Sequence, residues 1–301
     1  MHKSIRRKNL ALHLMVLPAI ILVFIFNYIP LFGIVIAFQD FVPAKGLFGD
    51  QEWVGLENFR FLFELPQTKQ VIINTIVIAL AKAIVGLIIP IIVALMLNSL
   101  RKQGLRSGIQ TLIYLPHFIS WVIISSILID ILSPSTGIIN QFLMQIGIEP
   151  VYFLGEPKYF RMTLVVSDLW KEFGYGSILY YAAMQGINPE LYEASDIDGA
   201  NKLRKIWHIT LPGIRMIIVL LGLLSLGNIL NAGFDQVFNL YNIQVLETGD
   251  ILDTYIYQLA FGTNLNYSLA TAASLLKSII SFVLISMAYY LSYKYADYRM
   301  F

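Results

Sequence analysis

Long apolar stretches, separated by short clusters of charged residues, are the feature that most limits what this chain can fold into. About six of them reach the roughly 20 residues that a helix needs to cross the hydrocarbon core of a membrane. In lipid the backbone must satisfy its own hydrogen bonds, so the stretches are predicted to be helices. The predicted spans are Leu10–Phe38, Val71–Leu100, Ile109–Ser133, Met162–Gly186, Gly213–Leu240 and Tyr267–Tyr293.

The composition supports an all-α membrane protein. Hydrophobic residues make up 57% of the 301 residues and charged residues 13%, whereas soluble domains carry about 25% charged residues. The formal net charge of +2 argues against a polybasic nucleic-acid binder. The absence of cysteine excludes disulfides, thiolate metal sites and cysteine nucleophiles.

Lysine and arginine residues are concentrated on one side of the predicted topology. The first apolar run is longer than the 7–15 residues of a signal peptide's core, so it is predicted to remain as a helix. If the N-terminus is cytoplasmic, the positive-inside rule is satisfied and both termini lie inside. The cytoplasmic set is Lys3, Arg6, Arg7, Lys8, Arg101, Lys102, Arg106, Lys202, Arg204, Lys205, Arg215, Lys294 and Arg299, and the external set is Lys45, Arg60, Lys69, Lys158 and Arg161.

Three segments are expected. Residues 1–70 form the first span and an external segment, residues 71–293 form a five-helix transmembrane domain, and residues 294–301 form a cytoplasmic tail. In the external segment, Leu56, Phe59 and Phe63 are spaced i, i+3 and i+7, which predicts a short amphipathic helix. That helix could contact the membrane or an external partner, or only cap the ends of the spans.

The cytoplasmic loop at 188–213 carries strong local helix signals. Asn188 suits an N-cap, Pro189 the first helical position, and Gly199 the left-handed residue that ends a helix. A second helical segment is predicted from Ala200 to Thr210, and Leu211-Pro212-Gly213 is predicted to break it before the fifth span.

The same loop resembles a known family. Glu193-Ala194-Ser195, followed by Gly199 and by Ile209-Thr210-Leu211-Pro212, resembles the cytoplasmic EAA signature of permease subunits of ATP-binding-cassette (ABC) importers. Ser195 stands where the family usually has Ala. Three further segments resemble permeases for oligosaccharides released from plant polysaccharides, including uronate-containing ones: Trp170-Lys171, Phe234-Asp235-Gln236 and Asp250 through Tyr257. The segment Val54–Phe59 resembles one that is common in sugar permeases.

The resemblance implies a type I ABC importer permease in the bacterial cytoplasmic membrane. Its loop would couple to a cytoplasmic ATPase, with Glu193 pairing to a basic residue there and Ala194 and Ser195 permitting close approach. The implied partners are a second homologous permease, two copies of the ATPase and an extracytoplasmic solute-binding protein. ATP and Mg²⁺ would bind the ATPase, and this chain would bind no cofactor. The implied coupling residues are Glu193, Ala194, Ser195, Asp196, Asp198, Gly199, Ile209, Leu211 and Pro212.

Motifs for chemistry within this chain are missing. No Gly-Lys pair occurs, so a phosphate-binding loop is excluded, and neither metal-ligand spacing of histidines nor a G-x-S-x-G sequence is found. No catalytic or metal site is therefore predicted. An ion- or proton-coupled secondary transporter, using carboxylates such as Glu172 and Asp130, stays open as the alternative.

Polar residues inside the spans are candidates for a substrate pathway. Ionisable groups there cost about 2.5–3.5 kcal/mol each, so they are expected to face the bundle interior or a cavity. Asn228, Asn231 and Asp235 are spaced to share one helix face, where they would either contact sugar hydroxyls or bind neighbouring helices. The pathway candidates are Trp170, Tyr175, Tyr180, Asn228, Asn231, Asp235 and Gln236, and the intramembrane charge candidates are Lys82, Lys171, Glu172 and Lys277.

Overall fold

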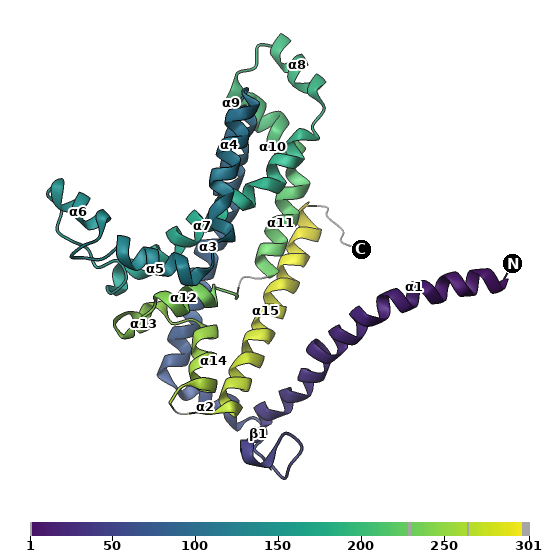
Figure 1. Cartoon of the computed structure of the whole chain (residues 1–301), viewed down its shortest axis with the longest axis vertical. Coiled ribbons are helices and arrows are strands. Elements are labelled where there is room, and N and C mark those ends of the chain that lie inside the picture. The colour runs from purple at the N-terminus through teal and green to yellow at the C-terminus, as the bar shows by residue number, and fades with distance from the viewer. Residues whose placement is uncertain (1, 228–229, 264, 297–301) are drawn as a thin grey trace. The chain divides into compact units, whose positions relative to one another are not determined.

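The computed structural model describes residues 2–227, 230–263 and 265–296, with side chains left out at 2–12, 226–227, 288 and 291–296. Helices dominate this part of the chain (Figure 1), which confirms the predicted all-α class. The chain divides into two compact units. The first unit comprises the first 65 residues together with Ile256–Leu276, and the second comprises Pro66–Tyr255 together with the residues from Lys277 onward.

The first unit begins with one long helical segment, in which His13–Phe38 is apolar and long enough to span a membrane. Beyond it, two short strands pair antiparallel, with Gln39 opposite Trp53. The elements are α1 (His2–Val23), the π-helix η1 (Phe24–Tyr28), the 3₁₀ helices η2 (Ile29–Phe38) and η3 (Pro43–Lys45), the strands β1 (Gln39–Asp40) and β2 (Glu52–Trp53), and α2 (Glu57–Glu64).

The predicted external amphipathic helix is present as α2, but its buried face differs from the prediction. Leu62 is buried, whereas Leu56 and Phe63 are exposed. The side chain of Asn58 determines how the helix is held, because its Nδ2 donates to the carbonyl oxygens of Ala37 (3.0 Å) and Gln39 (3.1 Å). This polar contact orients α2 on the end of η2, and apolar spacing alone could not reveal it.

The second unit is built around two long helices that lie side by side, α3 and α7. Ile78 and Ala79 of α3 and Phe160 and Leu164 of α7 form its main core with Val237 of α12. The elements are α3 (Pro66–Ser99), α4 (Gln103–Tyr114), η4 (Leu115–Phe118), α5 (Trp121–Ile131), α6 (Ile138–Gln145), α7 (Pro157–Gln185), α8 (Pro189–Ile197), α9 (Lys202–Lys205), the π-helix η5 (Ile206–Thr210), α10 (Leu211–Gly213), α11 (Arg215–Gly227), α12 (Phe234–Leu240), η6 (Ile243–Val245) and α13 (Leu246–Gly249).

Two further helices, α14 (Leu252–Phe261) and α15 (Tyr267–Ala296), contribute residues to both units. Within the described residues, three helices are long and apolar enough to cross a membrane, and two bent pairs raise the number to five. α7 fails that test because it carries Asp168, Lys171 and Glu172, yet its 29 residues exceed the length of a span. Five to six spans agree with the expected six.

Spans three and five are not the straight helices that the apolar runs predict. In span three, the chain bends by 100° between the helices Gln103–Phe118 and Trp121–Ile131. Span five, predicted as Gly213–Leu240, is interrupted, because α11 ends at Gly227 and α12 begins only at Phe234. Gly233 adopts a φ of +97° at this break, a conformation that residues with a Cβ rarely adopt.

Candidate functional site

The loop at 188–213, predicted to be cytoplasmic, forms α8, a turn and a second helical segment, as its local signals predict. Asn188 Oδ1 accepts the N–H of Glu190 at 3.1 Å and so caps α8. Gly199 ends the turn with a φ of +70°. Asn201 Oδ1 accepts the N–H of Arg204 at 2.9 Å and caps the next segment. Short-range hydrogen bonds therefore define this loop.

The second segment corrects the prediction in one respect. Leu211-Pro212-Gly213 does not break it but forms α10, which continues from η5. The chain turns at Ile214, and the helices on either side are bent by 64°. Pro212 is the second residue of α10 and lies two residues before this bend.

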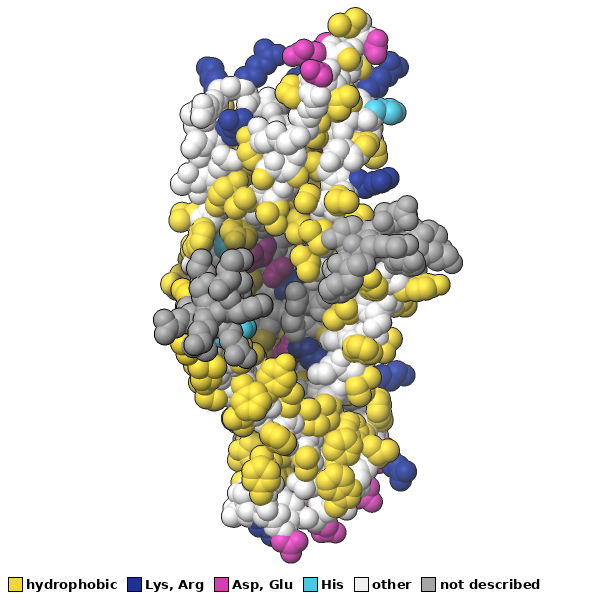
Figure 2. Space-filling model, turned by 90° about the vertical axis from the view of Figure 1, so that its right-hand side faces the viewer, with side chains coloured by type: hydrophobic (Ala, Val, Ile, Leu, Met, Phe, Trp, Pro, Cys, Tyr) yellow, Lys and Arg dark blue, Asp and Glu magenta, His cyan; other side chains and the backbone are white. Residues whose placement is uncertain are grey.

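The surface of the α8 loop combines acidic and apolar side chains. Glu193 and Ala194 are exposed, and Ser195 is half-buried because its Oγ donates to the carbonyl of Tyr192 at 2.7 Å. Ile197 is 89% exposed beside them. Acidic and basic side chains gather at the top of the view in Figure 2, where this loop lies. Leu203 and Trp207 of the second segment are also exposed, so the loop presents several large apolar side chains among charged ones.

Two side-chain contacts tie α8 to the segment that leads into span five. The Tyr192 hydroxyl lies 2.9 Å from Thr210 Oγ1, and Thr210 is buried. Lys205 and Asp196 form an ion pair across the turn. A displacement of α8 would therefore be passed to α10 and α11 rather than absorbed by a loose loop.

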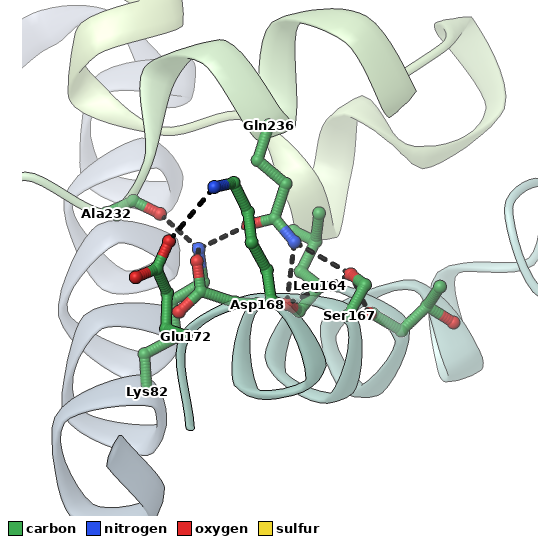
Figure 3. A network of polar contacts seen from close by, with 9 residues as sticks. Lys82, Leu164, Ser167, Asp168, Glu172, Ala232 and Gln236 are labelled. Carbon is green, nitrogen blue, oxygen red and sulfur yellow. Dashed lines mark hydrogen bonds and ion pairs between the residues drawn. The ribbon is translucent and has the colours of Figure 1, made fainter. Parts of the chain in front are cut away.

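Inside the membrane-spanning region, Lys82 of α3 is the centre of a polar network (Figure 3). Its Nζ donates to Asp168 Oδ1 of α7 at 3.2 Å, to the carbonyl of Ala232 at 2.8 Å, and to Gln236 Oε1 of α12. Gln236 is fully buried, and its Nε2 donates to the Leu164 carbonyl and to Ser167 Oγ, both at 2.8 Å. The network joins α3, α7 and the break in span five.

A second group of polar residues lies at the bend of span three. Lys171 Nζ donates to the carbonyl of His117 at 2.5 Å and lies 3.3 Å from Glu172 Oε1. His117 Nδ1 is 2.7 Å from Glu172 Oε2, and its ring stacks on Tyr175 with centroids 3.8 Å apart. These contacts satisfy the polar groups where the helix is interrupted.

The third lysine within the spans, Lys277 of α15, also has a carboxylate partner. Its Nζ donates to Asp253 Oδ1 of α14 at 2.5 Å and to Asn231 Oδ1 at 2.8 Å. Lys82, Lys171 and Lys277 are thus each paired with a carboxylate, as membrane-embedded charges usually are.

Two adjoining cavities follow the face of α3 and α7. The first, of about 140 Å³, is lined by Lys82, Asp168 and Glu172 among others. The second, of about 290 Å³, extends between α3, α7 and α11 to Ser225. Gly86, Tyr175 and Gly176 line both. In the view of Figure 2, acidic and basic side chains lie in a hollow at mid-height, surrounded by apolar ones.

The structure brings only part of the predicted pathway residues together. Tyr175 lines both cavities, and Tyr180 lines the larger one although its side chain is almost fully buried. Trp170 instead lines a separate apolar cavity of about 520 Å³ between α5 and α7. Gln236 binds Lys82 and is fully buried, so its side chain is not exposed to a substrate pathway.

The prediction that Asn228, Asn231 and Asp235 share one helix face in span five is wrong. Asn231 lies in the irregular break and Asp235 in the first turn of α12, so the i, i+3, i+7 spacing does not apply. Asn228 falls outside the described residues. Asn231 contacts Lys277, whereas Asp235 is exposed.

Sequence reasoning missed several residues of these networks, including His117, Asp253, Tyr192 and Thr210, and it placed Asp168 within its span without naming it as a site candidate. For Asp168 a signal existed, because it precedes Lys171 and Glu172 by three and four residues and so shares their helix face. For the others, the partners lie far away in the sequence and no local pattern indicates them.

Comparison with known proteins gives consistent results over most of the chain. Residues 86–301 match the family described as "Binding-protein-dependent transport system inner membrane component". The polygalacturonan/rhamnogalacturonan transport system permease protein YteP of Bacillus subtilis (strain 168) is 39% identical over 295 residues, which cover 98% of this chain and 91% of that protein.

Two solved structures are similar throughout. One is a crystal structure of a bacterial ABC transporter involved in the import of the acidic polysaccharide alginate, with a TM-score of 0.89 and 39% identity over 97% of this chain and 98% of that chain. The other is of the bacterial alginate ABC transporter in complex with alginate pentasaccharide-bound periplasmic protein, with a TM-score of 0.88 and 39% identity over 97% and 96%.

Proposed function

Because this chain belongs to the family of binding-protein-dependent transport system inner-membrane components, we propose that it forms part of the passage by which an acidic oligosaccharide enters the cell. The predicted ABC importer permease, its multi-pass location in the inner membrane and its dependence on a separate ATPase subunit are confirmed by the family and by the similar structures. Family membership also rules out the alternative of an ion- or proton-coupled secondary transporter, because transport in ABC importers is driven by ATP.

The observation that carries the substrate class is the similarity to carriers of polyuronates. YteP is named for polygalacturonan and rhamnogalacturonan, and the similar structures for alginate, each at 39% identity. Lys82 lines one of the two adjoining cavities, which fits an anionic substrate, and its carboxylate partner in this conformation is Asp168.

Uptake in cells lacking this gene tests the substrate class. Complementation with the wild-type chain should restore faster uptake of labelled galacturonate or alginate oligosaccharides than of neutral oligosaccharides of equal length. Equal uptake of the neutral compounds, or no uptake of either acidic one, would contradict the proposal.

The α8 loop is proposed as the contact with the ATPase. Exposed Glu193, the small residues Ala194 and Ser195 and the exposed Ile197 support this role. Asp196, Asp198, Gly199, Ile209, Leu211 and Pro212 complete the proposed coupling set. By this proposal the working assembly also contains a second, homologous permease and two ATPases that bind ATP and Mg²⁺, beside the extracytoplasmic binding protein.

Charge reversal at Glu193 tests the coupling role. Glu193→Lys should reduce co-purification of the ATPase or uncouple hydrolysis from uptake, because it would place like charges together at the contact. Glu149→Lys, the same change at an exposed position on the predicted external side, is the control and should have neither effect. Unchanged co-purification and unchanged uptake in Glu193→Lys would remove the loop from this role.

A further inference from the structure

The Lys82 ammonium is held so that one of its three contacts can be exchanged. The contacts with the Ala232 carbonyl and with Gln236 are anchored, because Gln236 is itself bound to Leu164 and Ser167. The contact with Asp168, at 3.2 Å, is the longest of the three. If the Asp168 carboxylate moves away, Lys82 keeps two acceptors and its position.

The carboxylates are more exposed than the lysine side chains with which they pair. The side chain of Lys82 is 10% exposed and that of its partner Asp168 27%, while the side chain of Lys171 is 7% exposed and that of Glu172 42%. Lys82, Asp168 and Glu172 all line the cavity of about 140 Å³. A ligand entering there meets Asp168 first, with Lys82 behind it.

The adjoining cavities offer room for part of a sugar chain. Together, the spaces of about 140 and 290 Å³ fall within the roughly 300–1,000 Å³ typical of ligand pockets. Tyr175 borders both, and its aromatic ring provides an apolar surface beside the charged groups. The site therefore combines a flat ring, a replaceable carboxylate and a fixed ammonium.

We propose that Lys82 is a carboxylate-exchange site, in which a uronate carboxylate of the passing oligosaccharide replaces Asp168 as the ligand of the ammonium. This inference rests on the proposed function, because it requires an acidic substrate. Exchange of one carboxylate for another keeps the buried ammonium paired at each stage, which avoids the cost of an unpaired charge. It also keeps net affinity low, as a transport pathway requires.

Selectivity follows from the same arrangement. A neutral sugar offers hydroxyl groups, which bind an ammonium more weakly than the carboxylate that they would displace. It therefore leaves the Lys82–Asp168 pair intact and gains nothing at this site. An acidic sugar of the same size competes on equal terms.

The experiment uses the complete transporter in proteoliposomes with its binding protein at one fixed concentration. The probes are a galacturonate trimer and the same trimer with its carboxyl groups reduced to neutral alcohols. Because the binding protein is the same throughout, its own preference cancels when each variant is compared with the wild type. The quantities measured are kcat and KM for each probe, from which the acidic-to-neutral ratio of kcat/KM is calculated.

Asp168→Asn removes the competing carboxylate and should lower KM for the acidic trimer by about tenfold while reducing kcat, because the substrate is now held too well. KM for the neutral trimer should stay unchanged. Lys82→Met should bring the acidic-to-neutral ratio close to one, and Lys82→Arg should retain part of it. If Lys82 and Asp168 had only a structural role, their substitution would lower the transport rates of the acidic and the neutral trimer by the same factor.

Lys277→Met is the matched control, since Lys277 is also a lysine within the spans with a carboxylate partner. It should leave the ratio at the wild-type value, even if assembly suffers. If the wild type transports the acidic trimer, but Asp168→Asn leaves KM for that trimer unchanged and Lys82→Met leaves the acidic-to-neutral ratio unchanged, the exchange site alone is overturned. Failure of the wild type to transport the acidic trimer would overturn the proposed function itself.

Discussion

Substitution of Gly233 tests how the break in span five is maintained. Its φ of +97° disfavours any residue with a Cβ, at a cost of about 1–3 kcal/mol. A Cβ built there would lie 2.8 Å from Lys82 Nζ, closer than real contacts allow. The ammonium would have to shift, weakening contacts to Ala232 and Gln236 that are worth about 1.5–3 kcal/mol each when intact.

Gly233→Ala should therefore destabilise the folded protein by about 2–4 kcal/mol, since the flexible lysine can yield part of the way. The measurement is the thermal midpoint of the detergent-solubilised transporter, followed by tryptophan fluorescence, together with uptake of the acidic substrate. We expect a lower midpoint by several degrees and reduced uptake.

Gly222→Ala in α11 is the matched control. Gly222 lies inside a helix, and the nearest atom to a built Cβ is Leu87 Cδ1 at an ordinary 3.8 Å. Alanine should be neutral or stabilising there by up to about 1 kcal/mol, because it favours the helix more than glycine does. If Gly233→Ala matches Gly222→Ala in midpoint and uptake, the conformation inferred for the break is wrong.

Three further predictions concern the second unit. Tyr192→Phe removes the hydroxyl that contacts Thr210, so more ATP should be hydrolysed per substrate molecule imported while ATPase co-purification is unchanged. An unaltered ratio of ATP hydrolysed to substrate imported would show that this contact does not transmit motion from α8. Burial raises the pKa of Asp250, which lies between spans five and six, to about 6. As the pH falls from 7 to 4, the folded state therefore takes up a proton before the unfolded state does, and the stability should increase by roughly 2–2.5 kcal/mol. Asp250→Asn should abolish this increase, measured as the rise in thermal midpoint between pH 7 and pH 4. The same pH profile in the variant and in the wild type would refute the prediction. Gly174→Ala would place a Cβ 2.0 Å from the Ile113 carbonyl and should cost 1–3 kcal/mol or more, seen as a lower midpoint; a wild-type midpoint would show that α4 and α7 are not so close.

Features that depend on neighbouring residues could be read from the sequence. The spans follow from apolar length, because an exposed backbone cannot be tolerated in lipid wherever the segment lies. The helix-turn-helix structure of the α8 loop follows from Asn188, which caps α8, and from Gly199, whose left-handed conformation ends it, because both act within a few residues. The position of Glu193 on exposed α8 could thus be predicted before any tertiary contact was known.

The candidate pathway could not be read in the same way. Asn231 and Asp235 looked like one helix face because the apolar run continues through the break, and nothing local marks Leu230–Gly233 as irregular except one glycine. The break is stabilised by Lys82, which lies 150 residues earlier and binds the Ala232 carbonyl. A helix interrupted in this way requires distant donors for its freed carbonyl groups.

Charge pairing shows the same division. The sequence alone indicated that Lys82, Lys171 and Lys277 must avoid lipid, because the cost of burying a charge depends only on the surroundings being apolar. Which carboxylate each one meets depended on the packing of α3 against α7 and on Asp253 of α14 facing Lys277. Solvation and short-range hydrogen bonds act at every residue independently, whereas an ion pair exists only after the fold brings two distant side chains within about 3 Å of each other.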